Sequence, residues 1–162
     1  MEPIASTAEI LACKMLGRNI NKTWINWAYD MLSAGFETEN LIMLAGELEP
    51  YNQFELQSLT DKVFSDLRLT WDNREQILKN YVCYLVDMAI NSKIKFINVL
   101  DLIKDIYIEL DHESSLSGFY MLYYAYDDLK HSDQQWYWDG ATRENIDEMA
   151  KDYFIEWSAN CK

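Results

Sequence analysis

The scarcity of glycine and proline constrains the fold of this chain most. Its 162 residues include five glycines and two prolines, so residues that end helices or form tight turns are rare. Long helices are therefore favoured over many short strands. Hydrophobic residues make up 49% of the chain and charged residues 25%, a balance typical of a globular domain with a buried core.

Apolar residues recur at the spacing of one helix face along most of the chain. Residues 24, 27, 28, 31 and 32, for example, are apolar and follow the i, i+3, i+4, i+7, i+8 pattern. No segment shows sustained alternation of apolar and polar residues. We therefore expect an all-α fold, a single-domain bundle of seven or eight helices over residues 1–162. Stripes of this kind predict helices over about 7–16, 23–34, 39–48, 53–67, 72–88, 96–110, 116–129 and 143–157.

Polar residues mark several of these helix starts. Ser6 with Glu9, and Asn52 with Glu55, have the spacing of a capping box, and Thr38 is expected to cap the third helix. The helix over 116–129 contains the run FYMLYYAY and is apolar almost all round at its middle. It is therefore predicted to be the most buried element.

Two segments share a pattern. WINWAYDM (24–31) and YVCYLVDM (81–88) both read aromatic-x-x-aromatic-x-x-Asp-Met. Residues 24–48 and 81–106 are thus a candidate internal repeat, which would indicate HEAT-like stacked helix pairs. The alternative is a chance likeness of two amphipathic helices, and two copies do not decide between these.

The net charge of −13 is concentrated in the last third of the chain. Residues 101–162 contain 14 acidic and 5 basic residues, a net charge of −9, against −4 for residues 1–100. Such a surface repels nucleic-acid phosphates and anionic membranes, but steers a basic protein towards it. We expect a protein partner, with no nucleic acid and no membrane bound.

The cysteines indicate a reducing compartment. Cys13, Cys83 and Cys161 are odd in number and far apart, and there is no CxxC, so neither a disulfide framework nor a structural zinc site is expected. Cys83 is interpreted as a small buried hydrophobe. The stretch ILAC before Lys14 resembles a lipoprotein cleavage site, but no basic residue precedes it. We expect a cytoplasmic protein without a signal segment.

Catalytic and metal-binding patterns are weak. His112 and His131 each follow a carboxylate, Glu109 and Asp128, by three residues, a spacing that di-iron helical bundles use. These pairs lie near the ends of consecutive helices, which antiparallel packing would separate by roughly 20 Å. Nucleophile-elbow and phosphate-loop motifs are absent from the sequence. We expect no enzyme, and no catalytic residue, cofactor or metal.

The stretch QQWYWDG (134–140) is the strongest candidate for binding, because aromatic residues beside acidic ones are typical of interface hot spots. The alternative is a clamp, in which both tryptophans pack under the last helix. A further possibility is a peptide groove lined by Tyr120 and Tyr124. The candidate partner-binding residues are Trp136, Tyr137, Trp138, Asp133, Asp139, Glu144, Asp147 and Glu148.

Two longer segments carry a family resemblance. WAYDMLSAGFETENLIMLAGEL (27–48) and YWDGATRENIDEMAKDYFIEW (137–157) resemble an uncharacterised family of small, acidic, all-helical bacterial proteins, some of which are similar to immunity proteins of polymorphic toxin systems. The resemblance implies a cytoplasmic protein that neutralises a cognate toxin by occluding its basic active cleft. It transfers no functional residue, because the similar residues are packing residues. A helical-repeat adaptor or regulatory module that binds a peptide or protein is the alternative.

Overall fold

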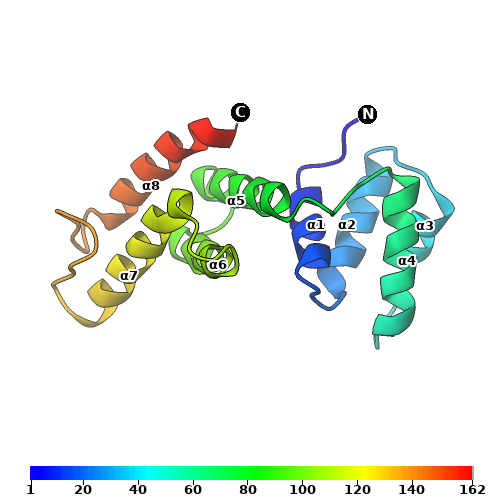
Figure 1. The fold of residues 1–162 in the computed structure, drawn as a ribbon, viewed down its shortest axis with the longest axis horizontal. Coiled ribbons are helices and arrows are strands. Elements are labelled where there is room, and N and C mark those ends of the chain that lie inside the picture. The colour runs from blue at the N-terminus through cyan, green and yellow to red at the C-terminus, as the bar shows by residue number, and fades with distance from the viewer. Residues whose placement is uncertain (162) are drawn as a thin grey trace. The chain divides into compact units, whose positions relative to one another are not determined.

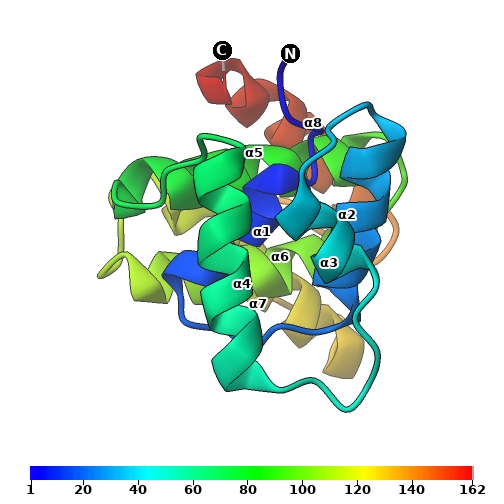
Figure 2. The same cartoon turned by 90° about the vertical axis from the view of Figure 1, so that its right-hand side faces the viewer.

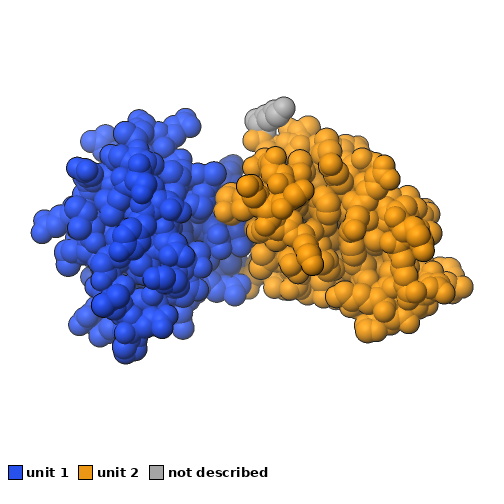
Figure 3. All heavy atoms as spheres, turned by 180° about the vertical axis from the view of Figure 1, so that it is seen from behind, with its two compact units in different colours: residues 1–81 blue, residues 82–162 orange. Residues whose placement is uncertain are grey.

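The regular structure is entirely helical. The computed structural model describes residues 1–161, and this part of the chain contains eight α-helices, two short 3-10 helices and no β-strand (Figure 1). This confirms the all-α prediction. The chain divides into two compact units, residues 1–81 and 82–162 (Figure 3). Helix α5, Arg74–Ile90, continues through the boundary between them. The single-domain organisation stays a prediction.

Unit 1 consists of α1 (Thr7–Met15), α2 (Lys22–Ser33), α3 (Glu39–Ala45), α4 (Gln53–Asp66) and the first part of α5. Two of the predicted caps are confirmed. Thr38 Oγ1 accepts a hydrogen bond from the Leu41 amide at 3.1 Å, and Asn52 Oδ1 accepts one from the Glu55 amide at 3.2 Å. Each satisfies an amide at a helix start that has no partner within the helix.

The capping box at the first helix is wrong. Ser6 has helical backbone angles, φ −65° and ψ −9°, and its side chain forms no capping hydrogen bond, because an N-cap side chain reaches the first-turn amides from an extended backbone. The start of α5 also differs from the prediction. The helix begins at Arg74 instead of residue 72, and Asn73 accepts a hydrogen bond from the Gln76 amide at 3.1 Å.

Large aromatic rings fill the core of unit 1. The Phe64 ring on α4 stacks on Trp24 at 5.9 Å between centroids and meets Trp27 and Trp71 edge-on at 6.3 and 5.1 Å. Thr7 is buried but satisfied, since its hydroxyl accepts a hydrogen bond from Trp27 Nε1 at 3.0 Å. Trp24 and Trp27 are three residues apart on α2, a spacing that places both indoles on the inward face of the helix, where these contacts form.

Lys14 brings a charged group into this core. Its side chain is only 8% exposed, and its ammonium forms an ion pair with Asp61 at 2.7 Å. The same group donates hydrogen bonds to the backbone and side-chain oxygens of Gln57 at 3.2 and 3.0 Å, and to Thr60 Oγ1 at 3.1 Å. A buried ammonium is tolerated only with such a set of acceptors, so Lys14 ties α1 to α4.

Unit 2 contains the rest of α5, α6 (Phe96–Glu109), the 3-10 helix η1 (Ser114–Leu116), α7 (Ser117–His131), α8 (Ile146–Trp157) and the 3-10 helix η2 (Ser158–Cys161). Helices α6 and α7 pack extensively against each other. Phe119 on α7 lies at the centre of the aromatic packing against α8. Its ring centroid is 5.1 Å from Tyr153, 5.3 Å from Phe154 and 5.1 Å from Trp157.

Helix α7 is not buried all round, contrary to the sequence prediction. Its buried residues, Phe119, Leu122, Ala125 and Leu129, form one face. The tyrosines are half-buried, and Met121 is 42% exposed. A tyrosine buries its ring while its hydroxyl stays near water. A run rich in tyrosine is therefore less buried than its apolar character in the sequence suggests.

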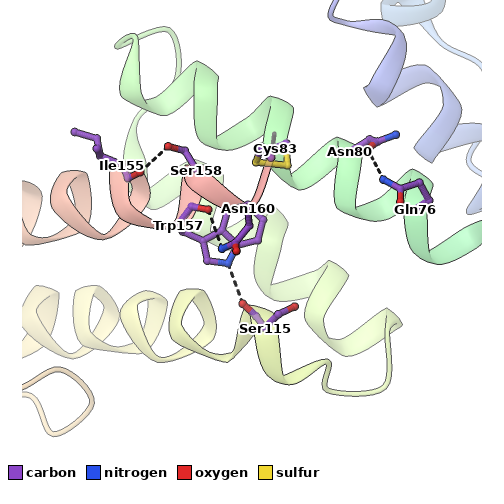
Figure 4. Close-up of a disulfide and its surroundings, with 9 residues drawn as sticks. Gln76, Asn80, Cys83, Ser115, Ile155, Trp157, Ser158 and Asn160 are labelled. Carbon is purple, nitrogen blue, oxygen red and sulfur yellow. Dashed lines mark hydrogen bonds between the residues drawn. A yellow bond between two sulfur atoms is a disulfide. The ribbon is translucent and has the colours of Figure 1, made fainter.

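A disulfide joins the two ends of unit 2 (Figure 4). Cys83 on α5 is bonded to Cys161 on η2, with their Cα atoms 5.7 Å apart. The prediction that the cysteines are unpaired is therefore wrong for these two, and Cys13 is the free cysteine of the described residues. The residues lie 78 apart in the sequence, and a pair this remote has no local sequence pattern.

The candidate repeat falls on comparable elements of the two units. Its first copy covers parts of α2 and α3, and its second covers parts of α5 and α6. The second helices differ in length, since α3 has 7 residues and α6 has 14. The internal repeat stays a prediction.

Candidate partner-binding surface

The loop between α7 and α8, residues 132–145, has a defined conformation. Gln135 organises it, because its Oε1 accepts hydrogen bonds from the Tyr137 and Trp138 amides at 2.8 and 2.7 Å. Its Nε2 donates to the Ala141 carbonyl at 3.3 Å and also to the Trp138 carbonyl. A single amide side chain thus satisfies backbone groups that a loop normally leaves to water.

The second half of the loop is held in the same way. Asn145 Oδ1 accepts from the Thr142 amide at 2.6 Å, and its Nδ2 donates to the Gly140 carbonyl at 3.0 Å. Gly140 has φ +81°, a conformation in which a side chain would be strained. Arg143 anchors the loop to the end of α7, since its Nε donates to the Leu129 carbonyl at 2.7 Å.

The two loop tryptophans have different environments, and only Trp138 packs as the clamp interpretation predicts. Trp138 is half-buried and packs edge-on against Tyr153 of α8 at 5.1 Å, as a clamp would. Trp136 is 84% exposed. A tryptophan kept in water on a hydrogen-bonded loop is unusual, and it makes Trp136 the main candidate for a partner contact.

Tyr137 connects this loop to the tyrosines of α7. It is 40% exposed, and its ring centroid lies 5.5 Å from that of Tyr124. Tyr124 lies 4.9 Å from Tyr120, which in turn lies 4.8 Å from Tyr107 on α6. We call these four residues the tyrosine strip. Tyr137 of the loop and the Tyr120–Tyr124 pair, two separate candidates in the sequence, are therefore in contact in unit 2.

A cation is already seated beside this strip. The Lys104 ammonium lies 4.2 Å from the centroid of the Tyr123 ring and 2.8 Å from Asp101. The hydrogen bond with Asp101 raises the pKa of Lys104, so the charge is retained. The Tyr123 and Tyr124 rings are 5.2 Å apart. The contacts of Lys104 show that an amino group fits here against both the face of a tyrosine and a carboxylate.

The pKa values of Tyr124 and Tyr126 in unit 2 lie above the ordinary value for tyrosine. The side-chain hydrogen bond between Tyr120 and Tyr124 raises the pKa of Tyr124. Burial and a hydrogen bond from its hydroxyl to Asp147, at 2.6 Å, raise the pKa of Tyr126 strongly. Both rings therefore stay neutral at physiological pH and act as hydrogen-bonding aromatic surfaces.

The acidic candidates fall into two groups. Asp133 and Asp147 already have partners within the chain, the Arg143 guanidinium at 2.7 Å and the Tyr126 hydroxyl. The other three, Asp139, Glu144 and Glu148, are exposed and form no ion pair within the described residues. These three remain available to cations of a partner, whereas Asp133 and Asp147 position the loop and α8.

Sequence reasoning missed several residues of this surface. Gln135 was not distinguished from its neighbour Gln134, because the two glutamines are adjacent and only the loop conformation brings one of them to the backbone amides of the loop. Lys104 and Tyr107 were not among the predicted residues. Their role depends on the packing of α6 against α7, which the sequence pattern of either helix alone does not contain.

The histidines lie at helix ends, as expected. His112 follows α6 with its ring edge-on to Tyr107 at 5.0 Å, and His131 is the last residue of α7. Among residues 1–161, no three His, Cys, Asp or Glu side chains are grouped so as to hold a metal ion. In the same residues, every helix is too short or too polar to traverse a bilayer.

Comparison of the chain with protein-family models, with curated proteins and with solved structures finds no match.

Proposed function

We propose that this chain is a non-enzymatic protein-binding protein, an immunity protein that neutralises a cognate bacterial toxin by occluding its basic active cleft. The observation that supports the proposal is Trp136, 84% exposed on a loop that Gln135 holds in place. A loop backbone that is held in place before binding loses less conformational entropy on association. Hot spots in interfaces are rich in tryptophan and tyrosine, and the tyrosine strip continues this surface.

The charge of the surroundings indicates a basic partner. Residues 101–162 carry a net charge of −9, and Asp139, Glu144 and Glu148 project from the loop and the start of α8. Such a field accelerates association with a basic surface and is screened by salt. A cytoplasmic location belongs to this proposal, although the Cys83–Cys161 disulfide removes the argument from unpaired cysteines.

A peptide-binding adaptor is the second candidate. The half-buried rings of Tyr120 and Tyr124, which meet edge-on at 4.9 Å, favour it, because aromatic side chains line many peptide grooves. An adaptor would bind a short peptide as tightly as the intact partner. An immunity protein that occludes a cleft needs the folded toxin domain.

The test is a capture experiment with a matched pair of variants. Tagged wild-type chain, Trp136→Ala and Ile155→Ala are each incubated with extract of the native cell. Ile155 is a control of similar type, 48% exposed on α8 and outside the loop and the tyrosine strip. We expect one basic protein to bind wild type and Ile155→Ala. Trp136→Ala should bind that protein roughly thirtyfold more weakly, because it loses an anchor worth about 2 kcal/mol.

The captured protein is then expressed alone and together with this chain. The proposal requires growth arrest in the first case and growth in the second, with an association rate that falls steeply between low and high salt. Equal capture by Trp136→Ala and wild type would show that the loop is not the contact. A salt-insensitive association rate would contradict the electrostatic mechanism.

A further inference from the structure

Unit 1 contains a groove between α3 and α4, which lie side by side in two views (Figures 1 and 2). The cavity has a volume of about 340 Å³. Its apolar lining comes from both helices, with Leu56 and Leu59 nearly inaccessible at the base and Met43 open to solvent. Its polar lining consists of Glu39, Asn40, Glu47, Glu55, Ser58 and Lys62.

Large apolar side chains are exposed on the same two helices and the loop between them. Met43 is 53% exposed, Leu48 80% and Phe54 89%. These side chains are not part of the core of unit 1, to which α3 contributes Leu41 and Leu44 from its other side. A seven-residue helix that is apolar on both sides has one face without an intrachain partner.

Acidic residues outnumber basic ones around the groove, whose lining has three glutamates and one lysine. Residues 37–61 contain six acidic residues and no Lys, Arg or His. Of the groove carboxylates, Glu39, Glu47 and Glu55 form no ion pair within the described residues. Lys62 is the cation of the lining. An apolar base below an acidic rim is complementary to a segment that carries both an apolar side chain and cations.

We infer that unit 1 has a second docking site, the α3–α4 groove, which binds an amphipathic, lysine- or arginine-bearing segment of a protein partner. An apolar side chain of that segment enters between Met43 and Leu59, and its cations pair with Glu47 and Glu55. This site lies in a different unit from the loop that carries Trp136, so it does not depend on the function proposed above.

The test uses the methionine methyl groups as reporters. The chain has seven methionines, of which Met43 lines the groove and Met121 is exposed in unit 2. Full-length chain with ¹³C-labelled methionine methyls is titrated with a synthetic amphipathic Leu/Lys helical peptide. A Leu/Glu peptide of the same pattern is the probe control. We expect the Met43 signal to shift with the Leu/Lys peptide and not with the Leu/Glu peptide.

Charge-reversal variants then separate this site from general attraction to an acidic protein. Glu47→Lys with Glu55→Lys should weaken peptide binding at least about tenfold. Glu2→Lys with Asp72→Lys changes the net charge equally at exposed positions outside the groove and should leave binding within about twofold. Trp136→Ala should bind the peptide as wild type does, even if it loses the partner proposed above.

Three results would overturn the inference. Equal shifts at Met43 and Met121 would mean that the peptide is attracted to acidic surface in general. If the Glu47/Glu55 double variant binds the peptide with wild-type affinity, these carboxylates do not contribute to the site. A Met43 signal that shifts on concentrating the protein alone would assign the groove to a second copy of the chain.

Discussion

Replacing Gly118 with alanine tests how α7 and α8 pack, and hence what supports the loop. An ideal Cβ on Gly118 would overlap the Tyr153 hydroxyl and lie only 2.5 Å from Cζ of that ring. The ring has little freedom to move away, because Phe119 and Trp138 each lie 5.1 Å from it. Overpacking of this kind costs about 1–3 kcal/mol, and the helix preference of alanine returns up to about 1 kcal/mol.

We therefore expect Gly118→Ala to destabilise unit 2 by up to about 2 kcal/mol, because the helix preference of alanine offsets part of the overpacking cost. Hydrogen exchange measures it directly, since amides of α7 and α8 should lose protection. Amides of α2 in unit 1 serve as the internal reference. Trp138 fluorescence should also change, because its neighbour Tyr153 has to shift.

The same substitution in a Tyr153→Leu background tests whether the Tyr153 ring causes the loss. In Tyr153→Leu the obstructing ring is gone, so Gly118→Ala should become neutral or stabilising by up to about 1 kcal/mol. The effect of one alanine thus changes sign with the residue opposite. If Gly118→Ala destabilises both backgrounds equally, the close approach of Gly118 to Tyr153 is not the cause.

Three other perturbations have definite expected outcomes. Lys14→Met should lower the free energy of unfolding by about 2–3 kcal/mol, because Lys14 donates hydrogen bonds to three partly buried oxygens; urea denaturation measures this, and a loss below about 0.5 kcal/mol would contradict it. In the wild type, the folded state keeps the Tyr126 phenol protonated, so the stability of unit 2 falls as the pH rises above 10.0, the ordinary pKa. Tyr126→Phe removes this phenol and should therefore make the stability of unit 2 less sensitive to alkali. An unchanged pH profile in that variant would count against this assignment. Iodoacetamide should label native Cys13 slowly at pH 8, because burial raises its pKa to about 11, and unfolding should release one reactive thiol without reductant and three with it.

Local patterns in the sequence were sufficient for most of the secondary structure. Helices α2, α4 and α6 match the predicted ranges closely, since each depends on a stripe of apolar residues within one segment. The caps at Thr38 and Asn52 were also predictable, because side chain and amide are three residues apart. Ser6 failed because its backbone angles are helical, which the residue type does not reveal.

The candidate site was predictable only in part. The sequence identified Trp136 and Trp138 but not their difference in exposure, which depends on Tyr153 in the next helix. The tyrosine strip joins residues from α6, α7 and the loop. The exposed side of α3 could not be separated from its buried side, because apolar residues occupy both.

The disulfide of unit 2 changes how the chain is connected. With residues 83 and 161 bonded, almost the whole unit is a covalent ring. A protease that cuts once in the loop at 132–145 therefore produces two fragments that stay attached until the bond is reduced. On a denaturing gel the nicked chain would run as one species without reductant and as two with it. The exposed loop can therefore be cleaved without separating the aromatic residues on its two sides.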